Sequence, residues 1–260
     1  MALNAQSPLM IWQGRYRTSF ECLDEMATSQ TPLADAFSSQ QWITKLKAMR
    51  TVALSGLYPR NSTLPRVITT LKCNVVYDFG GGSGWLFELV KNVTTLSTYV
   101  VIELPSVIRA LAEEVSNSSR IQFKELCEIT SEFRTPNTLL YANSVWHYLL
   151  DDEEILNVVT RISPQYILLD DLQISTDFEY YSLQRYYGTL IPCRFFELSN
   201  LIKLVEGCGY RAVSMSEFPK TYHEGTIPYV DLGESGSFPI HPPASVLFER
   251  VAIDMSRQPN

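Results

Sequence analysis

The chain has 260 residues, of which 45% are hydrophobic and 19% charged, as in an ordinary globular protein that can bury a full core. Its formal net charge is −7 and its basic residues are scattered singly, which argues against a nucleic-acid-binding groove. No stretch reaches the roughly 18 apolar residues of a transmembrane helix, and the N-terminus has no secretory signal pattern. The five cysteines lie far apart, so we expect neither a disulfide framework nor a paired-cysteine metal site, and a cytoplasmic location.

The N-terminal segment differs from the rest of the chain. Residues 1–70 contain no glycine-rich turn, and apolar residues fall at helical spacing within 33–57. Helices are therefore predicted there, with a buried face that carries Trp42, Ile43, Leu46 and Leu54. We expect a helical cap segment over 1–70, followed by one domain over 71–260.

From residue 74 onward, predicted strands and helices alternate. The strands are predicted at 74–78, 98–103, 121–124, 138–142 and 166–170, and the helices near 84–92, 105–116, 152–161 and 194–207. Two further strands, at about 210–216 and 245–252, are predicted to form an antiparallel hairpin joined by a Pro/Gly/Ser-rich loop over 225–243. Such alternation predicts an α/β fold with a doubly wound, mostly parallel sheet of seven strands.

Residues 74–84, Asn-Val-Val-Tyr-Asp-Phe-Gly-Gly-Gly-Ser-Gly, run from a predicted strand straight into a predicted helix. Such a turn points backbone N–H groups at a ligand, and Gly80, Gly82 and Gly84 would let that ligand approach closely. A dinucleotide fingerprint, G-x-G-x-x-G, needs glycine at the position where Trp85 stands. The spacing therefore counts against an NAD-dependent oxidoreductase.

Acidic and apolar residues follow the next predicted strands. Glu103 ends the second strand, where a carboxylate can accept both ribose hydroxyls of a nucleoside. The alternative is a charge at the N-terminus of the helix that Pro105 begins. After the third strand, Leu126 and Cys127 would wall an adenine ring and Glu125 would bind its amino group, unless this stretch is only a surface loop.

Several motifs resemble those of known methyltransferases. Asp-x-Gly-x-Gly-x-Gly over 78–84 resembles the first motif of class I S-adenosylmethionine (SAM) methyltransferases. Val-Ile-Glu-Leu-Pro-Ser-Val over 101–107 resembles the Asp-Leu-Pro-x-Val segment of small-molecule O-methyltransferases, and residues 142–156 resemble their Val-Leu-His-Asp-Trp-x-Asp-Glu segment. The whole chain resembles a bacterial methyltransferase family often encoded in surface-polysaccharide gene clusters, through Trp-Gln-Gly-Arg-Tyr over 12–16, the glycine turn and the Tyr-rich segment 179–184.

The resemblance implies a Rossmann-like fold and SAM as the cofactor, bound by the domain over 71–260. The cofactor-binding residues that it implies are Asp78, Phe79, Gly80, Gly81, Gly82, Gly84, Glu103, Leu104, Leu126, Cys127 and Asn143. The chain departs from the pattern in two places. Lys124-Glu125 replaces the usual Gly-Asp after the third strand, and the segment before the turn is too short for a winged-helix dimerisation domain.

Candidate chemistry follows from the same resemblance. His147 matches the histidine that acts as general base, and the alternative is a histidine packed beside Trp146 and Tyr148. The predicted acceptor-binding residues are Trp12, Tyr16, Asp171, Tyr180, Tyr181, Gln184 and Arg194. No metal site is predicted, because Asp170 and Asp171 are consecutive in a strand and so face opposite sides of the sheet.

The sequence thus predicts a SAM-dependent methyltransferase that methylates oxygen on a saccharide or another small polar acceptor, with no nucleic-acid partner and no transmembrane segment. Methylation of nitrogen on a small metabolite and a non-catalytic SAM-binding partner protein are the alternatives. The oligomeric state stays open, a homodimer included.

Overall fold

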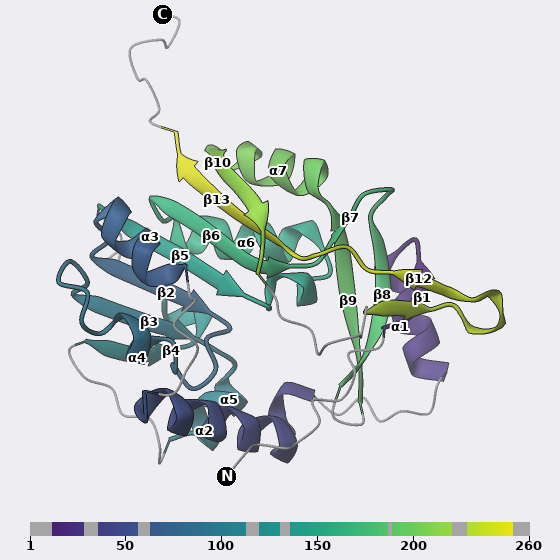
Figure 1. Cartoon of the computed structure of the whole chain (residues 1–260), viewed down its shortest axis with the longest axis horizontal. Coiled ribbons are helices and arrows are strands. Elements are labelled where there is room, and N and C mark those ends of the chain that lie inside the picture. Colours follow the sequence, from purple (N-terminus) through teal and green to yellow (C-terminus); the bar gives the residue numbers. More distant parts are fainter. Residues whose placement is uncertain are drawn as a thin grey trace, which may run out of the picture.

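The computed structural model describes residues 12–28, 36–56, 63–112, 120–130, 136–186, 189–219 and 228–251. These residues form a seven-stranded and a six-stranded sheet (Figure 1). In that view the six-stranded sheet lies to the right of the larger sheet, and α2 (Gln40–Leu54) lies below. The chain passes directly from one sheet to the other, because β6 (Tyr166–Leu172) is followed by β7 (Ile174–Ser175).

The seven-stranded sheet has the order β10-β13-β6-β5-β2-β3-β4. Its other strands are β2 (Val75–Phe79), β3 (Thr98–Ile102), β4 (Ile121–Lys124), β5 (Thr138–Asn143), β10 (Tyr210–Glu217) and β13 (Ala244–Arg250). Strands β4, β3, β2, β5 and β6 are parallel, and β13 runs antiparallel to both β6 and β10. The mostly parallel seven-stranded sheet predicted from the sequence is therefore confirmed.

Helices cover both faces of this sheet, which explains why its inner strands are apolar in almost every position. One face packs against α2, α3 (Leu64–Leu71), α4 (Phe87–Val90) and α5 (Pro105–Ala110). The other packs against α6 (Asp152–Ile162) and α7 (Leu198–Gly207). The helix predicted over 105–116 corresponds to α5, and its predicted part beyond residue 112 lies outside the described residues. Of the predicted buried face of α2, Ile43 and Leu46 are buried, but Leu54 is 60% exposed because it lies in the last turn.

The six-stranded sheet was not predicted. Its order is β12-β11-β1-β8-β9-β7, with β1 (Trp12–Tyr16), β8 (Tyr180–Tyr186), β9 (Thr189–Glu197), β11 (Tyr229–Asp231) and β12 (Ser237–Pro239). The N-terminal segment thus contributes a strand, β1, between β8 and β11, in addition to α1 (Ser19–Thr28), α2 and α3. The predicted loop over 225–243 likewise contains two strands.

The predicted helix over 194–207 is wrong at its start, because residues up to Glu197 belong to β9. Strand pairing with β8 places Phe195 opposite Tyr180, and their rings stack with centroids 4.6 Å apart. These tertiary contacts override the local helical pattern.

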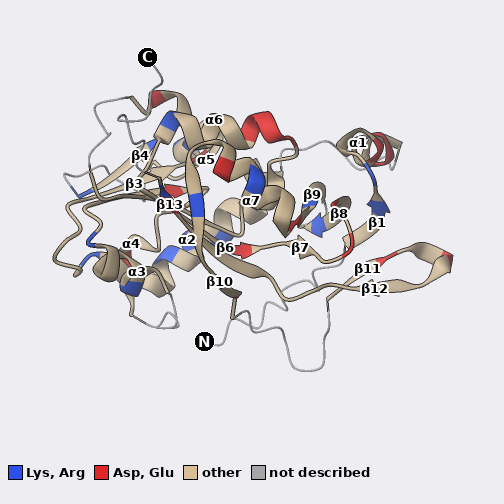
Figure 2. Ribbon diagram, turned by 90° about the horizontal axis from the view of Figure 1, so that it is seen from above, with Lys and Arg blue, Asp and Glu red and all other residues tan. Residues whose placement is uncertain are grey.

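Charge is spread over the described chain rather than gathered on one element (Figure 2). The first turn of α6 is the clearest acidic segment, with Asp152, Glu153 and Glu154. Acidic residues stabilise this end because they face the positive end of the helix dipole. None of the described helices has both the length and the apolar character that spanning a bilayer requires.

Candidate functional site

The glycine turn follows β2 directly. Gly80, Gly82 and Gly84 have φ values of 69°, 56° and 66°, a left-handed backbone that residues with a Cβ rarely adopt. A Cβ at Gly82 would come within 2.6 Å of Leu46 of α2. The turn therefore requires glycine for its backbone conformation and for its close contact with α2.

Asp78 lies beneath this turn. It is 1% exposed, and the Tyr99 hydroxyl donates a hydrogen bond of 2.7 Å to its Oδ2. Burial raises the pKa of Asp78 to about 7; the bond from Tyr99 lowers it and the charge of Glu103 raises it further. A Cβ on Gly81 would lie 2.3 Å from the Asp78 carboxylate, so Gly81 leaves room for that acid. The buried Asp78 carboxylate thus packs directly against the backbone of the turn at Gly81.

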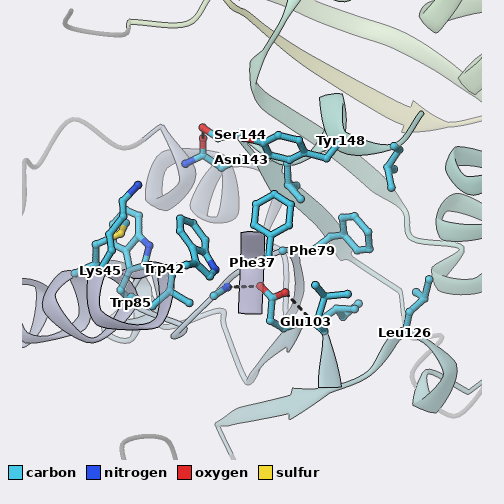
Figure 3. A pocket seen from close by; sticks show the side chains of 18 of the residues that line it. Phe37, Trp42, Lys45, Phe79, Trp85, Glu103, Leu126, Asn143, Ser144 and Tyr148 are labelled. Carbon is cyan, nitrogen blue, oxygen red and sulfur yellow. Dashed lines mark hydrogen bonds between the residues drawn. The ribbon is translucent and has the colours of Figure 1, made fainter. Parts of the chain in front are cut away.

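A pocket of about 650 Å³ opens at the carboxyl ends of β2, β3, β5 and β6 (Figure 3). Glu103 follows β3 and lines this pocket; its Oε2 accepts a hydrogen bond of 2.9 Å from the backbone N–H of Gly82. Its Oε1 accepts one of 2.8 Å from the N–H of Leu104, and both bonds are drawn in Figure 3. The carboxylate is therefore fixed beside the glycine turn.

The predicted cofactor-binding residues divide into two groups. Those that line the pocket are Phe79, Gly80, Gly82, Glu103, Leu104, Leu126, Cys127 and Asn143. Asp78, Gly81 and Gly84 are not in the lining. Gly84 instead packs against the sheet, where a Cβ would lie 3.0 Å from Ile121 and from Phe123. Most of the residues predicted to bind the cofactor therefore line one cavity.

Aromatic side chains from several elements outside the seven-stranded sheet also line the pocket. Phe37 of η1 (Ala36–Ser38) has its ring 4.9 Å from Tyr148 of η4 (Trp146–Tyr148) and 5.7 Å from Trp42 of α2. Trp42 lies 5.8 Å from Tyr186 of β8, whose hydroxyl accepts a hydrogen bond from Lys45. All five side chains line the pocket, and we call the four aromatic ones, Phe37, Trp42, Tyr148 and Tyr186, the aromatic wall. Trp42 is half-buried and packs on core residues, as its helical spacing predicts, and it also lines the pocket, which that spacing does not show.

Asn143, Ser144 and Asp171 form a polar corner at the ends of β5 and β6, and all three line the pocket. The Ser144 hydroxyl donates a hydrogen bond to Asp171 Oδ2. Asp170 points elsewhere: it accepts hydrogen bonds from Thr63, Tyr141 and Ser245. Within the described ranges, no group of three or more His, Cys, Asp or Glu side chains is arranged to hold a metal ion.

His147 is placed differently from its neighbour Tyr148. It is 3% exposed, its ring lies 4.3 Å from that of Tyr148, and it is not in the pocket lining. A base must reach the proton that it removes, directly or through one water. The role of His147 as the base stays a prediction.

Most predicted acceptor-binding residues lie in the six-stranded sheet and not in the pocket lining; these are Trp12, Tyr16, Tyr180, Tyr181, Gln184 and Arg194. Trp12 and Tyr180 pack on Phe195 in the core of that sheet. Arg194 pairs with Glu179 at 2.7 Å and with Asp152 at 2.8 Å. Of the predicted set, Asp171 alone lines the pocket.

Comparison of the sequence with protein-family models and with curated proteins gives no match. The structure, in contrast, matches human N-acetylserotonin methyltransferase in complex with SAM, with a TM-score of 0.50 and 15% identity over 91% of this chain and 68% of that one. The fold is that of a class I methyltransferase. A SAM-dependent methyltransferase from Clostridium acetobutylicum has a TM-score of 0.49, with 8% identity over 80% of this chain and 99% of its own.

Proposed function

We propose that the protein is a SAM-dependent methyltransferase. The observation that carries the proposal is the meeting of Gly80, Gly82 and Glu103 at one end of the pocket. In doubly wound sheets ligands bind at the carboxyl ends of the strands, and the fold matches that of methyltransferases. A glycine turn beside a fixed carboxylate suits a ligand with a ribose, whose hydroxyls would donate to Glu103.

The pocket lining suggests how such a cofactor would be held. Leu126 and Cys127 follow β4 and would pack on the adenine, with Glu125 beside them. A Cβ at Gly80 or Gly82 would meet Val145 or Leu46, so glycine lets the turn pack closely on these neighbours. Both glycines also line the pocket, where the amino-acid part of SAM would lie beside them. When bound, SAM supplies an electrophilic methyl group on a sulfonium centre.

The acceptor would occupy the other end of the pocket, between the aromatic wall and the polar corner. Flat rings and sugar faces both pack on aromatic side chains, so this wall suits a small ring-shaped acceptor. We propose transfer to oxygen on a saccharide or another small polar compound, in line with the sequence resemblance. Residues 1–70 act in this proposal as a cap, since Phe37 and Trp42 from this segment line the pocket.

Transfer of a labelled methyl group tests the proposal. The protein would be incubated with methyl-labelled SAM and separate pools of nucleotide sugars, lipid-linked glycans and phenolic or amine metabolites. We expect label in one pool with the wild type and much less with Glu103→Gln. Binding of S-adenosylhomocysteine without transfer to any pool would favour a non-catalytic SAM-binding protein, and binding of NAD in its place would overturn the proposal.

A further inference from the structure

Two neighbouring strand ends carry side chains on a backbone that disfavours them. Ser144, after β5, has a φ of 56°, and Asp171, near the end of β6, has a φ of 53°. Glycine adopts this conformation without strain, and strained residues of this kind cluster at functional sites. Ser144 and Asp171 also both line the pocket, and this combination makes their side chains candidates for a functional role.

The two side chains form one unit. The Ser144 hydroxyl donates a hydrogen bond to Asp171 Oδ2. The Ser144 hydroxyl oxygen also lies 3.3 Å from Asn143 Oδ1. Asp171 is 3% exposed and yet lines the pocket. The hydrogen bond from Ser144 fixes the orientation of the Asp171 carboxylate in the pocket lining.

The other acidic residues that line the pocket are Glu103 and Glu125, which lie where the proposed cofactor would bind. Glu103 is bonded to the glycine turn, and Glu125 stands next to Leu126 after β4. His147 is buried outside the lining. Among the described Asp, Glu and His residues, Asp171 is thus the lining residue that belongs to the polar corner.

We propose that Asp171 is the general base of the reaction and that Ser144 positions it; the inference rests on the proposed function. The acceptor oxygen forms its bond to the methyl carbon as the carbon–sulfur bond of the sulfonium breaks, and sulfur keeps that electron pair. Asp171 takes the hydroxyl proton from the acceptor and later releases it to water. His147 as the base is the competing assignment.

The first test needs no turnover and uses 4-nitrophenol as the probe, bound to the complex with S-adenosylhomocysteine. A carboxylate that accepts the phenol O–H favours the neutral phenol over the phenolate. The pKa of the bound phenol, read from the phenolate absorbance, should therefore be lower in Asp171→Asn than in the wild type by about 1 unit or more. The other charged lining residues, Lys45, Glu103 and Glu125, are the same in both proteins.

The second test measures methyl transfer to the acceptor pool labelled by the wild type. Asp171→Asn should lower the rate by about 10²–10⁴ while S-adenosylhomocysteine binding is kept. Asp170→Asn is the matched control, because it changes the adjacent buried carboxylate, which bonds to Thr63, Tyr141 and Ser245. It should lower the melting temperature and retain the rate.

The results of these tests either support or overturn Asp171 as the general base. An unchanged phenol pKa with an unchanged rate in Asp171→Asn would overturn the inference, as would a rate lost in His147→Gln and kept in Asp171→Asn. No saturable binding of 4-nitrophenol would overturn the placement of an acceptor hydroxyl at this corner. Failure of the wild type to bind S-adenosylhomocysteine would overturn the proposed function instead.

Discussion

The two sheets differ in the surroundings of several of their polar residues. In the seven-stranded sheet, Glu103, Asn143 and Asp171 stand at or next to strand ends and line the pocket. In the six-stranded sheet, Gln184 and Arg194 are 1% and 6% exposed and bond within the protein. These three polar side chains of the larger sheet thus line the pocket, whereas Gln184 and Arg194 attach the second sheet to the rest of the fold. Asp78 and Asp170 of the larger sheet are hydrogen-bonded within the protein.

The buried acid under the glycine turn is expected to give the largest effect on stability. The pKa of Asp78 is raised to about 7, so the folded protein binds this proton more readily than the unfolded chain. Its contribution to stability is present at low pH and is lost as the pH rises through 7. The free energy of unfolding should fall by on the order of 4 kcal/mol between about pH 4 and pH 8 from this group.

Asp78→Asn isolates this effect, because the amide oxygen can still accept the bond from Tyr99. Urea unfolding across this pH range should show a flatter profile for the variant than for the wild type. Parallel profiles would mean that Asp78 is not protonated near neutrality, and that the polar groups beneath the turn are not arranged as described.

Arg194 tests the second half of the comparison. Its side chain is 7% exposed, and its removal would leave Glu179, which is 20% exposed, without its partner. Arg194→Met should therefore lower the free energy of unfolding by about 3 kcal/mol. Arg185→Met, at an exposed position on β8, is the control and should cost under about 0.5 kcal/mol. Equal losses would show that Arg194 does not hold the sheets together.

Glu103→Gln tests whether a polar residue that lines the pocket binds the ribose of the cofactor. The amide can still accept the N–H of Gly82 but cannot give a charge-assisted bond to a ribose. S-adenosylhomocysteine should bind more weakly by about 2 kcal/mol, or roughly 30-fold, in calorimetry. Glu88→Gln, at a partly buried acid of α4 paired with Lys91, should bind like the wild type. Unchanged affinity in both variants would place the ribose elsewhere.

The smallest expected effect lies where the two regions touch. The Tyr148 hydroxyl donates a 2.7 Å hydrogen bond to Gln184 of β8, while its ring belongs to the aromatic wall. Tyr148→Phe keeps the ring and removes the bond, so stability should fall by about 1 kcal/mol. Scanning calorimetry should show a melting temperature lower by about 2–4 °C. No shift would mean that water replaces this bond in the wild type.

The sequence was sufficient where local pattern decides the structure. The strand before Gly80, the turn itself and Glu103 at the end of the next strand are all short-range features, and the fold carries them as predicted. The positions of Leu126 and Asn143 in the pocket follow from the same rule, because parallel strands end at one edge of a sheet.

The sequence was insufficient where distant segments meet. Trp42 has the spacing of a core residue, and only the placement of α2 directs it into the pocket. Trp12 and Tyr180 are residues typical of binding sites, but strand pairing between β1, β8 and β9 buries them against Phe195. His147 fits a motif, yet η4 brings its neighbour Tyr148 to the cavity.

Calorimetric titration of the wild type with S-adenosylhomocysteine, beside NAD, is the most direct test of the central claim that the glycine-turn end of the pocket holds SAM. We expect one saturable site per chain for S-adenosylhomocysteine, no comparable binding of NAD, and weaker binding in Glu103→Gln. In a parallel melting experiment, ligand at a hundred times Kd should stabilise the fold by about 2.7 kcal/mol. Absence of S-adenosylhomocysteine binding to the folded wild type, or tighter binding of NAD, would show that this end of the pocket is not a SAM site.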